Sequence, residues 1–337
     1  NTLAELAKVD GKTAKKLLRS VTATELAIWG RRVPLVRLGK SFAELAKVDH
    51  RMTQAALTMI DWQNLVRKVR ECNELQALSK ALSELHKVDR DIAESLLDTL
   101  DESMLVELCR GAPPDVFGRS LREFGVLSMQ LPTRIVTQIS PKEVAGSLLS
   151  SSIVQIGHTL AELTAVVPTF ATKVFNQLPT SELAKLAHSE SRLLSLCSVF
   201  SMLTKVPTEP PGNAALGLLR LLGADHFKTR IRYSRFEEIG LGLSRLHSID
   251  SKIAATILER TDVKTLEAKG KKEQAEKAVK ALHAISHIDP RVAASLTRVL
   301  IDERFLRLLM TLQPASLTQC LNELARIDPN IPREVLR

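Results

Sequence analysis

The residues with the clearest potential for binding chemistry lie between positions 223 and 236. This stretch interleaves four cations with aromatic side chains, among them the only tyrosine of the chain. Cations beside aromatic faces suit contacts with phosphates and stacked bases. An irregular connector whose aromatic side chains fill a gap in the core is the alternative interpretation. We predict partner contacts from Lys228, Arg230, Arg232, Tyr233, Arg235 and Phe236.

Two histidines have a spacing that can bind metal. His283 and His287 are four residues apart, so on a helix they would share one face and could ligate zinc. No glutamate stands beside His283 as in a metalloprotease helix, and no cysteine is near it in sequence to complete the ligand set. Two surface histidines are therefore the favoured interpretation.

Enzyme motifs are absent from the sequence. It contains no GxxxxGK[ST] or GxGxxG phosphate-binding loop and no GxSxG nucleophile turn. We therefore predict a non-catalytic chain with no catalytic residue, no bound metal, no cofactor and no small-molecule substrate.

A repeat must position these residues. The stretch from Leu82 to Asp89 recurs along the chain, and its final residue defines an anchor at positions 10, 49, 89, 128, 167, 207, 250, 289 and 328. Successive anchors are 39, 40, 39, 39, 40, 43, 39 and 39 residues apart. A period this regular is typical of a solenoid, in which each repeat buries its apolar face against its neighbours. The 43-residue interval contains the basic and aromatic stretch, and such interruptions often lie on a binding face.

Each repeat reads as two or three helices. Apolar residues at positions −7, −4 and −1 from the anchor, such as Leu82, Leu85 and Val88, lie on one face of a first helix. An anchor aspartate can cap a second helix. A capping signal near +12 predicts a short third helix, or a kinked continuation of the second. The predicted structural caps are Asp10, Asp49, Asp89, Asp250, Asp289 and Asp328.

These patterns predict an all-α fold, an α-solenoid of the HEAT or armadillo type with about nine repeats. Residues 1–206 would hold repeats 1–5 and the first helix of repeat 6, residues 207–237 the interrupted repeat, and residues 238–337 repeats 7–9. The repeat already runs at Leu3 and still runs at Leu336, without polar capping repeats. We therefore expect this chain to be a section of a longer polypeptide.

The net charge of +9 and the pI of about 9.5 invite a nucleic-acid interpretation. A basic residue recurs at position −2, but a glutamate three residues earlier can neutralise it on the same helix face. This pattern predicts the pairs Glu5–Lys8, Glu44–Lys47, Glu84–Lys87 and Glu323–Arg326.

The cysteines and the hydropathy indicate the compartment. Cys72, Cys109, Cys197 and Cys320 are far apart, which predicts free buried thiols in a reducing compartment. No apolar run approaches the ~20 residues that span a bilayer, and no signal peptide is visible. We predict a cytoplasmic protein with no membrane partner, and an organellar matrix is the alternative.

The repeat can be written L-x-x-[LI]-x-x-[VI]-D-x-x-x-A-x-x-L-L, and it is clearest in Leu82–Leu97 and Leu282–Leu296. It resembles the helical repeats in the long C-terminal arrays of bacterial STAND-class signalling ATPases. That resemblance implies a sensor arm that recognises a trigger, often a protein, and controls a nucleotide-binding core and an effector.

A fainter resemblance is to the organellar RNA-binding solenoids, which share the repeat length and the positive charge. They would imply matched polar residues at one fixed site. Position +2 is mixed instead: Lys12, Arg51, Asp91, Gln130, Thr169, Glu209, Lys252, Arg291 and Asn330. The sequence therefore favours a protein-recognition, sensor or scaffold module, with RNA binding as the alternative.

Overall fold

The computed structural model describes residues 10–208 and 213–331, and all regular secondary structure in these ranges is helical. The all-α class is thus confirmed for the described part of the chain. Contacts divide the chain into two compact units, each treated by itself. Unit 1 is Asn1–Leu148 with Glu162–Val174, and unit 2 is Leu149–Ala161 with Phe175–Arg337. No described helix is both long and apolar enough to cross a bilayer.

The helices recur in the order that the anchor pattern predicts. The first helices, which precede the anchors, are α4 (Leu35–Ala46), α7 (Leu75–His86), α10 (Pro114–Leu127), α13 (Ile153–Val166), α16 (Leu193–Leu203), α18 (Phe236–His247), α21 (Ala275–Ser286) and α24 (Pro314–Ile327). The second helices are α2 (Gly11–Arg19), α5 (His50–Thr58), α8 (Arg90–Asp98), α11 (Leu131–Thr137), α14 (Pro168–Asn176), α19 (Ser251–Glu259) and α22 (Pro290–Leu300). The third helices are α3 (Ala23–Arg32), α6 (Trp62–Arg70), α9 (Glu102–Arg110), α12 (Pro141–Leu149), α15 (Thr180–Ser189), α20 (Val263–Gly270) and α23 (Glu303–Met310).

Aspartate side chains cap the N-termini of second helices. Asp89 Oδ1 accepts a hydrogen bond from the backbone N–H of Ile92 at 3.0 Å. Equivalent bonds fix the starts of α2, α5, α19 and α22 at Asp10, Asp49, Asp250 and Asp289. Each bond satisfies a donor that the first turn of a helix leaves without a partner.

Asp328 lies directly after α24, and its Oδ1 accepts a hydrogen bond from the N–H of Asn330 at 3.0 Å. The second helix that the sequence predicts after this anchor would continue into residues 332–337, which lie outside the described ranges.

The third helices have caps of their own. Thr22 forms a capping box with Glu25 at the start of α3. Asp61, Asp101, Asp262 and Asp302 accept backbone hydrogen bonds at the starts of α6, α9, α20 and α23. The third segment is therefore a separate helix in these repeats.

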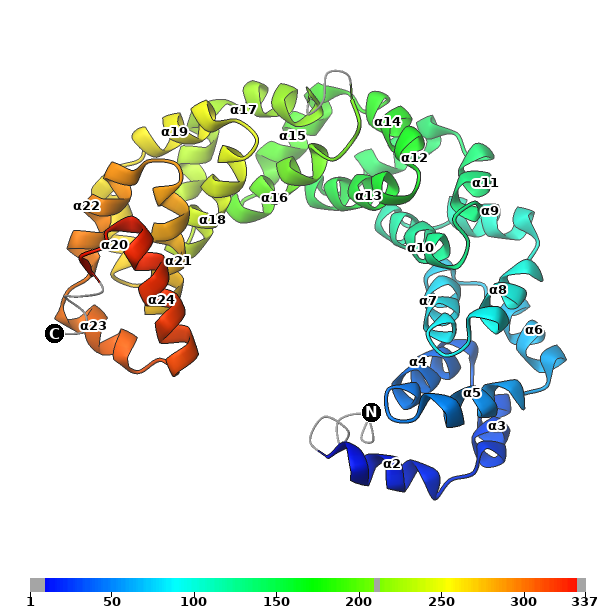
Figure 1. Cartoon of the computed structure of the whole chain (residues 1–337). Coiled ribbons are helices and arrows are strands. Elements are labelled where there is room, and N and C mark those ends of the chain that lie inside the picture. The colour runs from blue at the N-terminus through cyan, green and yellow to red at the C-terminus, as the bar shows by residue number, and fades with distance from the viewer. Residues whose placement is uncertain (1–9, 209–212, 332–337) are drawn as a thin grey trace. The chain divides into compact units, whose positions relative to one another are not determined.

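First helices of neighbouring repeats pack side by side. Helices α4, α7 and α10 form a row in unit 1, and α16, α18, α21 and α24 form a row in unit 2 (Figure 1). Leu82, Leu85 and Val88, at positions −7, −4 and −1, are buried as the apolar spacing predicts. Glycines allow a close approach: a Cβ on Gly39 would lie 2.7 Å from Ala81 O, and one on Gly240 2.6 Å from Ala281 Cα. Helices α4 and α7, and likewise α18 and α21, therefore meet backbone to backbone, with position −10 of the earlier helix against position −8 of the later one.

Arginines at position +21 join successive repeats of unit 1. Arg31 donates to Met59 O at 3.0 Å, Arg70 to Thr99 O at 3.4 Å and Arg110 to Gln138 O at 2.9 Å. The three acceptors are the C-cap residues of α5, α8 and α11. Each arginine thus donates to a free carbonyl at the negative end of the next repeat's second helix.

The interrupted repeat still contains a second and a third helix. They are merged in α17 (Asn213–Ile231), which breaks at Gly223, a residue with φ of 69°. Glycine suits this left-handed conformation because it has no Cβ. Phe227 and Phe236 on either side of the following turn are fully buried. Both aromatic rings therefore fill the core, as the connector interpretation expects of them.

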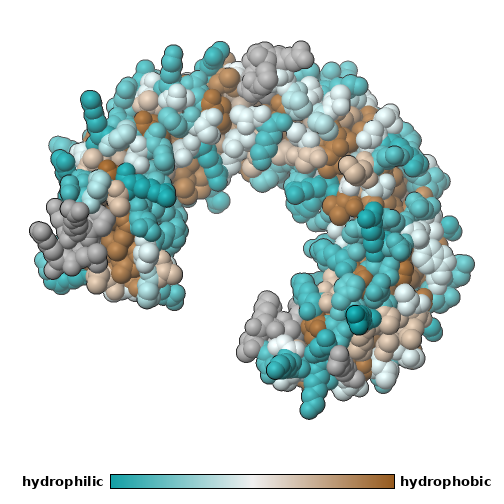
Figure 2. Space-filling view, viewed as in Figure 1, coloured by the Kyte–Doolittle hydropathy of each residue, from teal (hydrophilic) through white to brown (hydrophobic). Residues whose placement is uncertain are grey.

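Polar side chains dominate the surface in view, with hydrophobic ones in small scattered patches (Figure 2). Two of the predicted ion pairs are present, Glu44–Lys47 at 2.6 Å and Glu84–Lys87 at 2.9 Å. Glu323 instead accepts a hydrogen bond from Gln319 at 3.0 Å. The predicted pair Glu5–Lys8 lies outside the described residues.

Candidate partner-binding surface

The predicted contact residues separate into exposed and buried side chains. Lys228, Arg232, Tyr233 and Arg235 are exposed, and Tyr233 has 84 % of its surface free. Phe236 is buried as the first residue of α18. Arg230 is also buried, with 8 % of its surface exposed. Of the six predicted contact residues, these four are therefore the ones accessible to a partner.

The guanidinium of Arg230 donates hydrogen bonds to several backbone carbonyl groups. Its Nε donates to Glu190 O at 2.6 Å, and its Nη2 donates to Ala187 O at 3.1 Å and to His188 O at 2.8 Å. These carbonyls belong to the last turn of α15 and the residue after it, where no helical donor remains. Nη1 donates to His226 O at 3.1 Å. Burial lowers the pKa of Arg230 from its ordinary value. The guanidinium therefore joins α17 to α15.

Two lysines make the same kind of bond elsewhere. Lys68 and Lys269 each lie 19 residues after an anchor. Lys68 Nζ donates to Val33 O at 2.5 Å, and Lys269 Nζ donates to Ser234 O at 2.6 Å and to Arg232 O at 2.9 Å. Arg230 lies 23 residues after its own anchor at 207, and it aligns with Lys269 once the four extra residues of the 43-residue interval are counted as an insertion. A cation at +19 thus binds the connection that follows the preceding repeat's third helix.

Lys269 therefore holds the turn that carries the exposed residues. It fixes the carbonyls of Arg232 and Ser234, and the N–H of Tyr233 donates to Arg230 O at 3.0 Å. Lys271 and Lys272, which follow Lys269 at the end of α20, are exposed as well. We define the basic edge of unit 2 as the exposed residues Lys228, Arg232, Tyr233, Arg235, Lys271 and Lys272.

The arginines of the basic edge have no carboxylate partner in the part of the chain that the structure describes. Arg232, Arg235 and Lys228 form no ion pair there, whereas Arg260 pairs with Asp225 at 3.1 Å on the same unit. Glu238 accepts the backbone N–H of Arg235 at 3.1 Å, so this carboxylate caps α18. The side chains of the edge are free to meet an acidic ligand.

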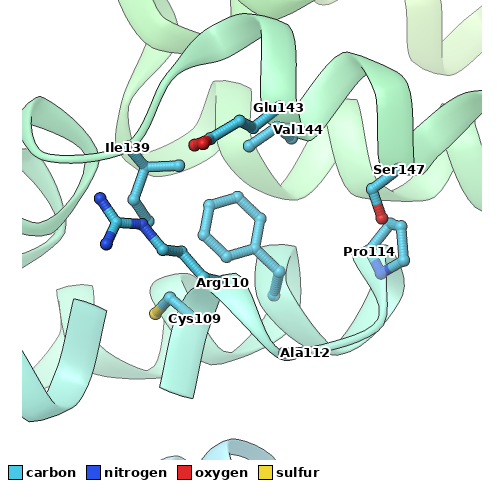
Figure 3. Close-up of a pocket in the computed structure, with 9 residues that line it drawn as sticks. Cys109, Arg110, Ala112, Pro114, Ile139, Glu143, Val144 and Ser147 are labelled. Carbon is cyan, nitrogen blue, oxygen red and sulfur yellow. The ribbon is translucent and has the colours of Figure 1, made fainter. Parts of the chain in front are cut away.

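A cavity of about 280 Å³ lies in unit 1 (Figure 3). Its walls come from the end of α9, the start of α10 and helix α12, with Pro114, Phe117 and Val144 as apolar lining. Arg110 at its rim already bonds Glu107 at 2.6 Å and Gln138 O at 2.9 Å. The cavity thus offers apolar contacts, and the arginine at its rim already has partners. The basic edge, whose cations have no carboxylate partner among the described residues, is therefore the candidate site.

The cysteine thiols are poor nucleophiles. All four are free, with Cys72 half-buried and the other three buried. Burial raises the pKa of Cys109 and Cys197 to about 12 and that of Cys320 to about 11. These three thiols therefore stay protonated at neutral pH.

The histidine pair, His283 and His287, brings two ring nitrogens close together. The Nε2 atoms of His283 and His287 are 3.4 Å apart. Within residues 10–208 and 213–331, no group of three or more His, Cys, Asp and Glu side chains is arranged to hold a metal ion.

A comparison of this chain with protein-family models, with curated proteins and with solved structures finds no match.

Lys271 and Lys272 on the basic edge, and Lys269 that supports its turn, belong to no motif of the sequence. The sequence stretch from Lys264 to Lys280 reads as a solvated helix because glutamates are interspersed. Lys269 can be recognised from the sequence only by aligning the repeats, because Lys68 and Lys269 then share position +19.

Proposed function

We propose that this chain is an α-solenoid segment that binds a protein partner, as the recognition, sensor or scaffold part of a larger protein. The 39-residue repeat and the packing of helices against sequence neighbours support the solenoid. Its resemblance to the repeat arrays of STAND-class ATPases supports a sensor role.

One observation carries the proposal. The turn from Arg232 to Arg235 is fixed by Lys269 from behind, yet it leaves two arginines and a tyrosine exposed and without an acidic partner among the described residues. Tyrosine and arginine are enriched at the centres of protein interfaces, and an ordered turn limits the entropy lost on binding.

RNA binding is the second candidate function. It is favoured by Tyr233, whose ring is free to stack on a base between Arg232 and Arg235. A protein partner remains preferred because the residues at position +2 show no matched polar code.

The experiment captures partners on the full chain from a nuclease-treated lysate and compares two double variants. Arg232→Glu with Arg235→Glu reverses the basic edge, while Lys252→Glu with Arg291→Glu makes the same charge change at exposed positions elsewhere in unit 2. A protein captured by wild type and by the control but lost with the edge variant supports the proposal. Equal capture by both variants contradicts it.

Binding to a mixed RNA pool decides the alternative. Nucleic-acid affinity falls steeply with salt concentration as phosphates are neutralised. Tight binding at ~50 mM salt that the edge variant abolishes would replace the protein partner with RNA.

A further inference from the structure

A row of cations runs across the first helices of unit 1. Lys40 on α4, Lys80 on α7 and Arg119 on α10 all stand at position −9, one in each of three successive repeats, and all three are exposed. Helices α4, α7 and α10 pack in this order (Figure 1). The three side chains therefore recur at the same register on neighbouring helices. We name them the −9 row.

The −9 row differs from the basic residues at −2 on the same helices. Lys47 and Lys87 at −2 are neutralised by Glu44 and Glu84 at 2.6 and 2.9 Å. Lys40 and Lys80 have no carboxylate within ion-pair distance among the described residues. Paired and unpaired lysines occur on the same two helices. The lack of a carboxylate partner at −9 therefore follows from the position in the repeat and not from the net charge of the chain.

Acidic groups lie near the row, but its two lysines form no ion pair with a described residue. Arg119 forms an ion pair with Asp115 at 3.7 Å, which is longer than the −2 pairs. Glu123 interacts electrostatically with Lys80 and Arg119, but it is partly buried and accepts a hydrogen bond from Ser79 Oγ at 2.5 Å. Burial raises the pKa of Glu123.

The spacing of the row suits an extended polypeptide. Packed helices are about 8–10 Å apart. A polyproline II segment has three residues per turn and advances about 3.1 Å per residue, so side chains three residues apart share one face and lie about 9 Å apart. Every third residue of such an extended segment, laid across the row, would therefore meet one cation.

Aromatic side chains are the feature that separates a peptide from single-stranded nucleic acid at this row. Base binding without sequence preference uses exposed aromatic platforms. The aromatic residues of α4, α7 and α10 are Phe42, Phe117 and Phe124, and all three are buried. The row thus offers cationic side chains but no exposed aromatic ring of these helices on which a base could stack.

We propose that Lys40, Lys80 and Arg119 bind an extended acidic segment of a protein partner, with an acidic residue at every third position. The proposal deepens the proposed function, on which it rests for the class of partner, and it assigns a second contact surface in unit 1.

The test measures fluorescence anisotropy of labelled nine-residue peptides with the full chain. One peptide repeats Glu-Ser-Ser three times, and a second has the same composition with its three glutamates adjacent. The spaced peptide is expected to bind more tightly, and Lys40→Gln with Lys80→Gln should weaken its binding by about threefold or more.

Lys47→Gln with Lys87→Gln is the matched control, since it removes the same charges from the same two helices. Weaker binding by the −9 variant than by this control supports the proposal. Equal losses in both variants, equal affinity for the two peptides, or tighter binding of an oligouridine than of the spaced peptide would overturn it. The variants of Arg232 and Arg235 test the basic edge independently, so failure at either surface is recognised separately.

Discussion

Arg230 is the residue whose removal should reveal how the basic edge is supported. Replacement by Met keeps much of the side-chain volume but leaves the carbonyls of Ala187, His188 and Glu190 without their donor. We expect the free energy of unfolding to fall by about 2–4 kcal/mol, because buried acceptors lose a charged partner. Urea denaturation of Arg230→Met measures this loss.

Arg232→Met is the control for this change, since Arg232 is exposed two residues away. Its effect on unfolding should stay within about 0.5 kcal/mol. Equal losses in the two variants would show that the carbonyl contacts of Arg230 contribute nothing to stability.

His226 should make unit 2 sensitive to acid. Burial lowers its pKa to about 4, with Arg230 and His188 adding to the shift. Its Nδ1 is 3.2 Å from Arg230 Nη1, and its ring lies edge-on to His188 at 4.2 Å. In the unfolded chain a histidine titrates near 6.5, so between about pH 6.5 and 4 the unfolded state binds more protons. The stabilisation is present above pH 6.5 and is lost as pH falls towards 4.

The measurement compares urea midpoints of wild type and His226→Gln at pH 7.5 and pH 5. The wild type should lose more stability than the variant between these two values, because glutamine does not titrate. Identical pH dependence of the two proteins would mean that His226 is not protonated on unfolding in this range.

Single residues could be predicted from sequence where one local rule determines their role. Asp89 is recognisable as a cap because a turn precedes it and an apolar face starts after it. Arg230 has no such local rule. Its burial depends on carbonyls some 40 residues earlier in the chain, which only the packing of repeats brings within reach.

At the scale of helices, glycine at position −10 sets how closely first helices approach. A Cβ at residue 240 would meet the Cα and the carbonyl oxygen of Ala281 at 2.6 and 2.7 Å, and backbone cannot move aside as a side-chain tip can. Gly240→Ala should therefore cost about 1–3 kcal/mol of unfolding free energy. Thermal and urea melts would both register it.

Gly217 in α17 provides a matched control in the same unit. Apart from its chain neighbours and the backbone of its own helix, no described atom lies within 4 Å of a Cβ built on it, so Gly217→Ala should stabilise the helix by about 0.4–1 kcal/mol. Opposite signs for the two substitutions are the expected result. Destabilisation by both would indicate that helix approach is not limited by position −10.

Helices with their own start signals were predictable, and their contacts were less so. The capping residues near +12 correctly indicate separate third helices such as α6 and α9. The small residues at −10 and the cations at +19 are visible only when the repeats are aligned and read by column. They carry no capping or apolar-spacing signal, since their effect is on the neighbouring repeat.

On the scale of the whole chain, the period predicts the all-helical class, but the division into two units has no counterpart in the spacing. Anchors on both sides of the division near residues 148–175 are separated by 39 or 40 residues, and the longest interval lies elsewhere. Contact density depends on how each pair of neighbouring helices packs. That information is spread over many apolar residues of similar type.

The two units should respond separately to core damage, because coupling in a repeat array passes between nearest neighbours. Both tryptophans of the chain, Trp29 and Trp62, belong to unit 1, so their fluorescence reports that unit while circular dichroism reports all helices. Leu82 in unit 1 and Leu282 in unit 2 are equivalent and fully buried, and each change to Ala should cost about 2–5 kcal/mol. In urea, Leu282→Ala should lose helical signal before its fluorescence changes, whereas Leu82→Ala should shift the fluorescence transition first. Coincident transitions in both variants would instead mean that the chain unfolds as one cooperative block.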